Sequence, residues 1–273
     1  MNYRHSFHAG NFADLVKHAL VLWLLRTRQA AGPVTVIDTH AGAGLYDLTG
    51  DAARSREAEA GVARLMAAEG RPPLIEALAQ AVAAINPDGG VRFYPGSPLL
   101  IANRLRAADQ YLGYELHPPV LALLEAALKG RASAEARGGD GYEAAVVAAR
   151  RSPAGALVLI DPPFERPDDY WRAADAAAAV MRADRSATVA VWTPLKDMET
   201  FDGFLRRLAG AGAGDALVAE ARLRPLTDPM RMNGCAMVVL GAPDGAETAA
   251  RDICGWVVGA LGETGGRAEV WRS

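Results

Sequence analysis

A tetrapeptide that follows a buried strand constrains the fold of this chain more than any other feature. The apolar run at 156–160 (ALVLI) ends in Asp161-Pro162-Pro163-Phe164. A short aliphatic run of this kind predicts a buried parallel strand. The two prolines end it, because neither can donate a backbone hydrogen bond to a sheet. We therefore expect an acid, a rigid loop and an aromatic ring at the carboxyl edge of an open α/β sheet, where ligands bind.

This loop has the chemistry to hold an amine. The ionised carboxylate of Asp161 accepts hydrogen bonds, and the carbonyl of Pro162 is a second, rigidly held acceptor. Phe164 offers a flat face for a planar heterocycle. Together these groups predict a pocket for an exocyclic amine on a nucleic-acid base. A strand cap followed by a rigid turn is the alternative interpretation.

The pattern of apolar runs predicts a doubly wound sheet. Five runs alternate with helical stretches, which predicts parallel strands joined by right-handed crossovers. The last two runs are separated by a loop too short for a helix, so they should pair antiparallel. We thus expect a seven-stranded, mostly parallel sheet with an antiparallel last strand. Its strands are expected at 34–38, 110–115, 134–137, 156–161, 187–192, 216–223 and 234–240.

An inserted helical subdomain is expected at 46–94, because 54–68 and 74–85 are rich in Ala and Glu. The remaining residues, 1–45 and 95–273, would form the sheet domain with an N-terminal arm. Asn11 is expected to cap a helix at about 12–28, and Ser97 to cap another that ends near residue 107.

Composition limits the kinds of partner. The formal net charge is −3, so a nucleic acid would have to meet a local basic patch. Cys235 and Cys254 lack metal-ligand spacing, and His5 and His8 have no matched further ligands, so we expect no metal site. No apolar run has membrane-spanning length, and no signal peptide is visible. We expect a soluble cytoplasmic protein that does not bind a membrane.

Acids follow four successive strands of the predicted sheet. Asp38 precedes the small-residue turn 39–44 (THAGAG), and Glu115, Asp140 and Asp161 follow later strands. Glu115 can accept from both hydroxyls of a ribose, and Asp140 with the backbone of Gly141 can pair with an adenine edge. A dinucleotide fingerprint would need a third glycine, and Asp38 would repel phosphate. The set predicts S-adenosylmethionine as the cofactor.

The chain resembles class I methyltransferases that carry Asp-Pro-Pro-aromatic and act on adenine amines. More narrowly, it resembles the RlmJ family, bacterial adenine-N6 methyltransferases of 23S ribosomal RNA. The matching segments are YRHSFHAGNFADLVKH (3–18), DTHAGAG (38–44), YPGSP (94–98), ELHP (115–118), DG (140–141) and LIDPPF (159–164). Phe164 departs from the family, which often has Tyr there; the ring is kept and a hydroxyl contact is lost.

The resemblance implies a class I methyltransferase fold and in-line transfer of a methyl group to the N6 amine of a specific adenine. Asp161 would be the catalytic residue, with Pro162 and Phe164 beside it. The cofactor site would include His18, Asp38, His40, Gly42, Ser97, Glu115, Asp140, Gly141 and Asp161. Tyr3, Arg4, His5 and Lys17 would contact the RNA. We expect a monomer.

Other functions remain open at this point. A DNA adenine-N6 methyltransferase would share the chemistry, but no separate DNA-recognition domain is visible. A methyltransferase for small molecules or protein amides fits the basic, aromatic N-terminal arm less well. A non-catalytic RNA-binding protein with a methyltransferase fold would not need the full set of acids. The segment 227–233 is a candidate substrate loop.

Overall fold

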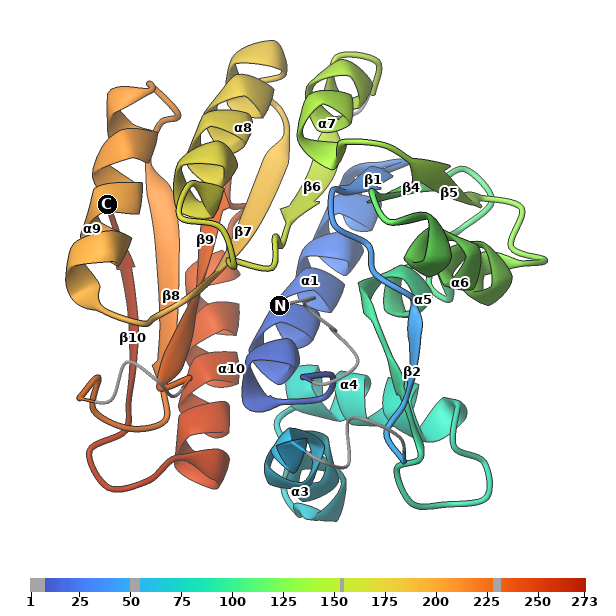
Figure 1. The fold of residues 1–273 in the computed structure, drawn as a ribbon, viewed down its shortest axis with the longest axis vertical. Helices are drawn as coiled ribbons and strands as arrows, with labels where there is room; N and C mark the ends of the chain where they lie inside the picture. The colour runs from blue at the N-terminus through green and yellow to red at the C-terminus, as the bar shows by residue number, and fades with distance from the viewer. Residues whose placement is uncertain (1–7, 50–54, 153–154, 228–231) are drawn as a thin grey trace.

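The computed structural model describes residues 8–49, 55–152, 155–227 and 232–273. Its main sheet has eight strands in the order β10-β8-β9-β7-β6-β1-β4-β5 (Figure 1). The strands are β1 (Thr35–Asp38), β4 (Gln110–Glu115), β5 (Ala134–Gly138), β6 (Ala156–Ile160), β7 (Thr188–Pro194), β8 (Ala216–Arg222), β9 (Gly234–Leu240) and β10 (Arg267–Arg272). The expectation of seven strands is wrong by one, because β10 pairs with β8 at the edge.

The parallel part of the sheet has the doubly wound order. Strands β5, β4, β1, β6 and β7 are neighbours in that order and parallel throughout. Counted along the chain among themselves, they have the order 3-2-1-4-5, and the order reverses between β1 and β6. Strand β9 pairs antiparallel with both β7 and β8, which confirms the predicted antiparallel pair. The ligand crevice of such a fold is therefore expected beside the carboxyl ends of β1 and β6.

Helices cover both faces of the sheet. One row contains α7 (Gly141–Ala149), α8 (Asp169–Ala183) and α9 (Met198–Gly210), packed side by side. The other contains α10 (Ala246–Leu261), α1 (Phe12–Ala31), α5 (Ser97–Ala102) and α6 (Pro118–Leu128). Strands β6 to β9 are buried along their full length, as expected for a sheet covered on both faces. No helix of the described residues is long and apolar enough to cross a membrane.

Helix α1 begins where the sequence predicts. The side chain of Asn11 accepts hydrogen bonds from the backbone amides of Ala13 and Asp14, so it caps the helix. The helix runs three residues beyond the expected end at Arg28. Its apolar side chains are buried, and Lys17 and His18 are buried with them. A buried lysine needs a partner of opposite charge, because an unpaired buried charge is costly.

The segment inserted after β1 is framed by a two-stranded ladder. Strands β2 (Leu45–Asp47) and β3 (Phe93–Pro95) pair antiparallel. Between them lie the π-helix η2 (Glu59–Ala63), α3 (Arg64–Ala67) and α4 (Pro73–Ala84), in the two predicted helical regions. Helix α4 packs against both α1 and α10, so these two helices join the segment to the rest of the molecule.

The prediction that Ser97 caps a helix is wrong. The N-cap residue of α5 is Gly96, no side chain caps the helix, and α5 ends at Ala102 rather than near residue 107. The hydroxyl of Ser97 instead donates a hydrogen bond to the carboxylate of Asp38 at 2.6 Å. Ser97 therefore lies beside Asp38, at the carboxyl end of β1.

Candidate active site

The carboxylate of Asp161 forms an ion pair with a buried lysine. Asp161 directly follows β6, and its side chain is 13% exposed. The ammonium of Lys17 lies 2.6 Å from Oδ2 of Asp161 and 2.8 Å from Oδ1 of Asp14. Burial opposes the positive charge of Lys17, but the two carboxylates outweigh it and hold its pKa well above the usual value. Lys17 is therefore a charged group held in contact with the carboxylate of Asp161.

This placement gives Lys17 a protein partner that the sequence did not predict, and its contact with RNA stays a prediction. The resemblance put Lys17 with Tyr3, Arg4 and His5 as an RNA contact, but only 4% of Lys17 is exposed. It lies on the inward side of α1 because two carboxylates compensate its charge there. The other three residues lie outside the described residues. Sequence analysis also missed Asp14, although an acid three residues before a lysine on the stripe of a helix is a visible signal.

Asp38 is a fully buried acid with one oxygen unused. Ser97 Oγ and the hydroxyl of Tyr111 donate hydrogen bonds to its Oδ2, at 2.6 and 3.1 Å. Among the described residues, Oδ1 has no hydrogen-bond partner. Burial, with a contribution from nearby Asp161, raises the pKa of Asp38 to about 6 despite the two hydrogen bonds. A buried acceptor without a partner is costly, so this oxygen fits a ligand that brings a cationic donor.

Glu115 organises the turn that follows β1. Its Oε2 accepts from the backbone amide of Gly42 at 3.2 Å, and its Oε1 accepts from that of His117 at 2.9 Å. Gly42 has φ 66°, and a Cβ there would lie 2.3 Å from the hydroxyl of Tyr46. Glycine is therefore required at this point of the turn. The predicted acid and glycine are brought together as expected, and their role toward a ribose stays a prediction.

Asp140 is engaged in two contacts at the start of α7. Its Oδ1 accepts from the amide of Tyr142 at 2.9 Å, and its Oδ2 lies 2.8 Å from the guanidinium of Arg172. A Cβ on Gly141 would lie 2.1 Å from the carbonyl oxygen of Thr39. The loop after β5 thus lies directly against the loop after β1. The predicted adenine contact would use a carboxylate that already caps a helix.

The two predicted histidines differ in their surroundings. His18 lies inside the protein, with Nδ1 2.8 Å from the hydroxyl of Tyr94. His40 packs edge-on against Tyr142, and its Nδ1 is 2.7 Å from the hydroxyl of Thr39. Burial lowers the pKa of His40 to about 4, against the opposite effect of nearby acids such as Asp161. His40 is therefore neutral near pH 7, and any contact with a ligand is a neutral hydrogen bond or a packing contact.

Phe164 does not present an open face in this structure. Its ring packs against those of Tyr170 and Trp192, with centroids 4.6 and 5.7 Å apart, and only 4% of the residue is exposed. Its φ of 50° is unusual for a residue other than glycine. The ammonium of Lys196 donates to its carbonyl oxygen at 3.1 Å. The expected stacking of a base on Phe164 therefore requires the ring or its neighbours to move.

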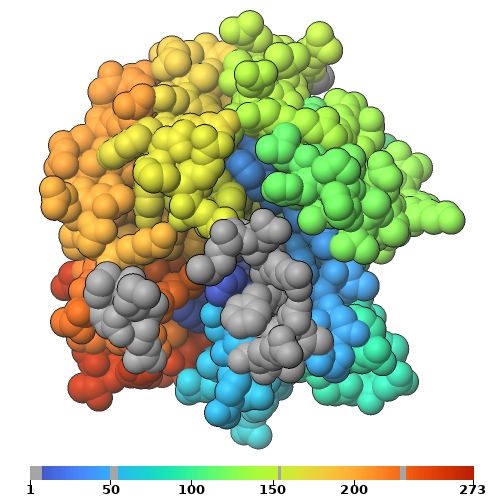
Figure 2. All heavy atoms as spheres, viewed as in Figure 1, coloured from blue at the N-terminus to red at the C-terminus, as the bar shows by residue number. Residues whose placement is uncertain are grey.

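The space-filling view shows atoms of the N-terminal part of the chain, in blue, within a hollow between its yellow and green parts (Figure 2).

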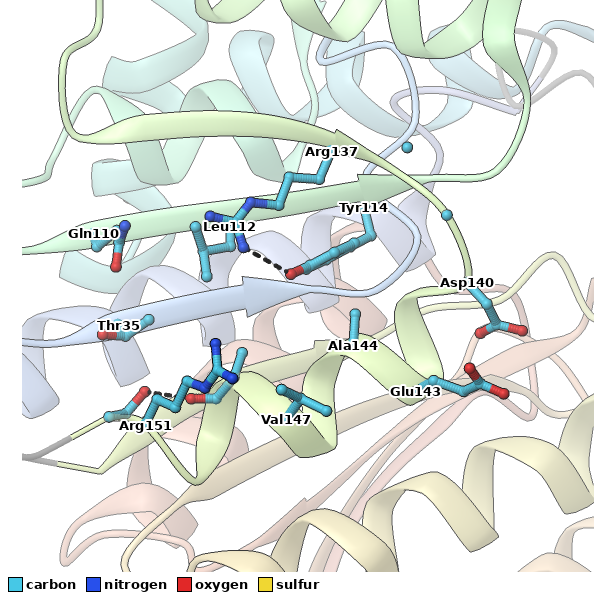
Figure 3. A pocket seen from close by; sticks show the side chains of 14 residues that line it. Thr35, Gln110, Leu112, Tyr114, Arg137, Asp140, Glu143, Ala144, Val147 and Arg151 are labelled. Atoms are coloured by element: carbon cyan, nitrogen blue, oxygen red, sulfur yellow. Dashed lines mark hydrogen bonds between the residues drawn. The ribbon is translucent and has the colours of Figure 1, made fainter.

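A pocket of about 530 Å³ lies between β4, β5 and α7 (Figure 3). Within it, Arg137 donates to the hydroxyl of Tyr114 at 3.2 Å. Asp140 borders this pocket, whereas Asp38, Glu115 and Asp161 do not. The pocket therefore meets the candidate active site only at the loop after β5.

Comparison with known proteins identifies the family. A family model described as "Ribosomal RNA large subunit methyltransferase D, RlmJ" matches residues 31–273. The chain belongs to this family. It is 31% identical to the Ribosomal RNA large subunit methyltransferase J of Escherichia coli K12, over 94% of this chain and 92% of that protein. The protein of the same name from Haemophilus influenzae is 30% identical, over 93% and 91% of the two chains.

A solved structure supports the same fold. The crystal structure of a protein from Legionella pneumophila superposes with a TM-score of 0.89 at 25% identity, over 97% of this chain and 98% of that chain. That protein therefore shares its fold with this chain over nearly the whole length of both. Within the described residues, no group of three or more His, Cys, Asp or Glu side chains is arranged to hold a metal ion.

The acids of the site fit the cofactor of a methyltransferase. S-adenosylmethionine carries an ammonium and a sulfonium but no phosphate. The unused Oδ1 of Asp38 is a buried acceptor suited to such a cation. Asp38 and Asp161 follow the adjacent strands β1 and β6, with Asp38 level with Leu159 in the register. The two acids therefore flank the point where the strand order reverses.

Proposed function

We propose that this protein transfers a methyl group from S-adenosylmethionine to the N6 amine of an adenine in 23S ribosomal RNA. The observation that carries the proposal is the carboxylate of Asp161, held by buried Lys17 at the switch point of the sheet. Membership of the RlmJ family and the names of the two curated relatives support a ribosomal RNA substrate.

The cofactor would be held by the loops after β1, β4 and β5. Asp38 offers Oδ1 to a cationic group, Glu115 is the expected partner of the ribose hydroxyls, and Asp140 with Gly141 is the expected partner of the adenine. When bound, S-adenosylmethionine supplies an electron-poor methyl group on its sulfonium. A dinucleotide would instead place two phosphates against these acids, which is electrostatically unfavourable.

Asp161 and Pro162 would orient the target amine. The N6 amine is a weak nucleophile because its lone pair is delocalised into the ring. Hydrogen bonds to the Asp161 carboxylate and the Pro162 carbonyl would favour tetrahedral geometry and stabilise the positive charge that develops on nitrogen. The amine becomes acidic only as its new bond forms, so Asp161 need not be a strong base. Positioning of this kind supplies a large part of the acceleration.

Lys17 gives Asp161 a fixed direction. Its ammonium occupies Oδ2 at 2.6 Å, and Asp14 holds the ammonium from the other side at 2.8 Å. A mostly buried carboxylate that is held by an ion pair is already oriented, so it loses little orientational freedom when the substrate binds. The adenine must be unpaired or flipped out to reach this carboxylate. Recognition of the RNA would then depend on its shape and on exposed bases.

We also propose that the protein acts in the cytoplasm, on ribosomal RNA, as a monomer. The N-terminal arm, with Tyr3, Arg4 and His5, is the proposed RNA contact. The arm brings polar and basic groups to a protein whose net charge is −3. A local basic contact of this kind is needed where the whole molecule does not attract phosphate.

Incubation with methyl-labelled S-adenosylmethionine tests the proposal. Unmodified 23S ribosomal RNA and duplex DNA containing adenine are the two substrates, and nucleosides are separated after digestion. We expect label in N6-methyladenosine from RNA, none in DNA, and none from RNA with the variant Asp161→Ala. Label in DNA at a comparable rate would support a DNA adenine methyltransferase. Cofactor binding without label in any nucleic acid would contradict the catalytic assignment.

A further inference from the structure

The inserted segment meets the N-terminus of α1 backbone to backbone. The amide of Val62 donates to the carbonyl oxygen of Gly10 at 2.8 Å. A Cβ at Gly61 would lie 2.2 Å from that same oxygen, and a Cβ at Gly10 would lie 2.9 Å from Cγ1 of Val62. Both residues must be glycine for the two chains to approach this closely. The contact falls within the π-helix η2, a rare geometry that is frequent at functional sites.

One side chain of the inserted segment adds a second link to the same place. Oε1 of Glu57 lies 2.9 Å from Nδ1 of His8, and its Oε2 accepts from Nδ2 of Asn11 at 2.9 Å. The hydrogen bond to Glu57 is the largest cause of a raised pKa of His8. Because Glu57 holds the nitrogen of the Asn11 amide, the oxygen of that amide is directed to the helix. Glu57 therefore fixes the orientation of the cap of α1.

From this cap, polar contacts continue to the catalytic carboxylate. The amide of Asp14 donates to the capping oxygen of Asn11 at 3.0 Å, and Oδ2 of Asp14 accepts from the amide of Gly10 at 2.9 Å. Oδ1 of Asp14 holds Lys17, and Lys17 holds Asp161. Glu57 thus stands at one end of an unbroken series of contacts through the first turn of α1, and Asp161 stands at the other.

We propose that Glu57 is a positioning residue for the methyl-transfer reaction. By holding the cap of α1, it sets the place of Asp14 and Lys17, and through them the direction of the Asp161 carboxylate. The inserted segment thereby contributes to catalysis without touching the reacting atoms. This inference rests on the proposed function, since it assigns Asp161 the role of orienting the target amine.

Loss of the Glu57 side chain should affect the position of the α1 cap more than the stability of the fold. Its side chain is 32% exposed, so its contacts add little to the free energy of unfolding. The rest of α1 is held by its buried apolar stripe, which includes Leu15, Leu20 and Leu24. Loss of Glu57 should therefore loosen the first turn of α1 and leave the remainder of the helix in place.

The variant Glu57→Ala tests the inference against the matched variant Glu59→Ala. Alanine favours helix at both positions, and Glu59 is 62% exposed and pairs only with nearby Arg56 among the contacts of the described residues. We expect Glu57→Ala to slow single-turnover RNA methylation about tenfold, with affinity for S-adenosylhomocysteine within about twofold of wild type. Amide hydrogen exchange should accelerate at Ala13 and Asp14 alone. Glu59→Ala should match wild type in all three measurements.

A double-mutant cycle distinguishes coupling from general damage. If Glu57 acts through the Asp161 carboxylate, Glu57→Ala should cause little further loss in an Asp161→Asn background. An undiminished tenfold loss in that background would overturn the inference, and so would a wild-type rate for Glu57→Ala. If the wild-type protein methylates no RNA, the proposed function fails instead. Unchanged exchange at Ala13 and Asp14 would then still refute the role of Glu57 in ordering the turn.

Discussion

Replacement of Asp161 by Asn is a demanding test of the site because Lys17 determines how the amide must lie. An Asn side chain has one acceptor, its oxygen, and one donor group, its NH2. The ammonium of Lys17, 2.6 Å from Oδ2 in the wild type, can only donate. The oxygen of the amide must therefore turn to Lys17, and its NH2 must turn to the substrate. The target amine then meets a donor where it needs an acceptor.

The size of the effect follows from what is lost. Asp161→Asn removes the negative charge that would stabilise a positively charged transition state, and it also removes the acceptor that orients the amine. Loss of one preorganised group of this kind costs about 2.7–4 kcal/mol, or a hundred- to a thousandfold in rate. The fold should survive, because Lys17 keeps its ion pair with Asp14 at 2.8 Å. Asp161→Ala should be slower still.

Single-turnover methylation of an RNA fragment with the target adenine measures this loss. Calorimetry with S-adenosylhomocysteine checks that the cofactor site is intact, and Asp168→Asn is the matched control. Asp168 is an exposed acid further along the same loop, paired with Arg166. We expect wild-type rates for Asp168→Asn. An Asp161→Asn enzyme within about threefold of the wild-type rate would show that the tetrapeptide is only a strand cap.

Three further predictions concern the cofactor and the RNA. The pKa of Asp38 is raised to about 6, so its carboxylate is mostly ionised above that pH and protonated below it. The ammonium of S-adenosylhomocysteine favours the ionised form, so the affinity for this ligand should fall up to about tenfold per pH unit below pH 6. Titration calorimetry measures this affinity, and the Asp38→Asn variant should show no such dependence on pH. Glu115→Ala should weaken the same binding by about 1–3 kcal/mol, whereas tight binding of NAD to the wild type would contradict the choice of cofactor. Tyr3→Ala should reduce RNA methylation and leave cofactor affinity unchanged; equal activity on RNA would mean that the arm does not contact the substrate.

The central strands could be predicted because burial on both faces requires unbroken aliphatic runs. The edge of the sheet could not be predicted in the same way. Strand β10 has the sequence RAEVWR and is exposed or half-buried along its length, so it lacks both the aliphatic run and a clean alternation. Its pairing with β8 is a tertiary contact. Strands β2 and β3 have three residues each, too few to show a period.

The contacts of two candidate site residues could not be predicted from the sequence. Ser97 stands before a proline at the start of a helix, which is an ordinary capping signal, yet its hydroxyl bonds to Asp38, 59 positions away in the chain. Lys17 lies on a helix that is buried throughout residues 12–22, and its partner Asp161 is 144 positions away. Local patterns show which residues carry polar chemistry. They do not show which distant residue compensates a buried charge.

The distribution of charge at the carboxyl edge of the sheet favours a cationic methyl donor over a dinucleotide with its phosphates. Asp161 pairs with Lys17, and Asp140 pairs with Arg172. Asp38 receives only neutral hydroxyls from Ser97 and Tyr111, and its second oxygen has no partner among the described residues. In a fully buried place such an acid raises the free energy of the folded protein whenever it is ionised. A ligand with a positive charge removes that cost on binding, whereas a ligand with phosphates would increase it. The position of the uncompensated acid, at the end of β1 and one strand from Asp161, is therefore the position expected for the cationic part of the cofactor.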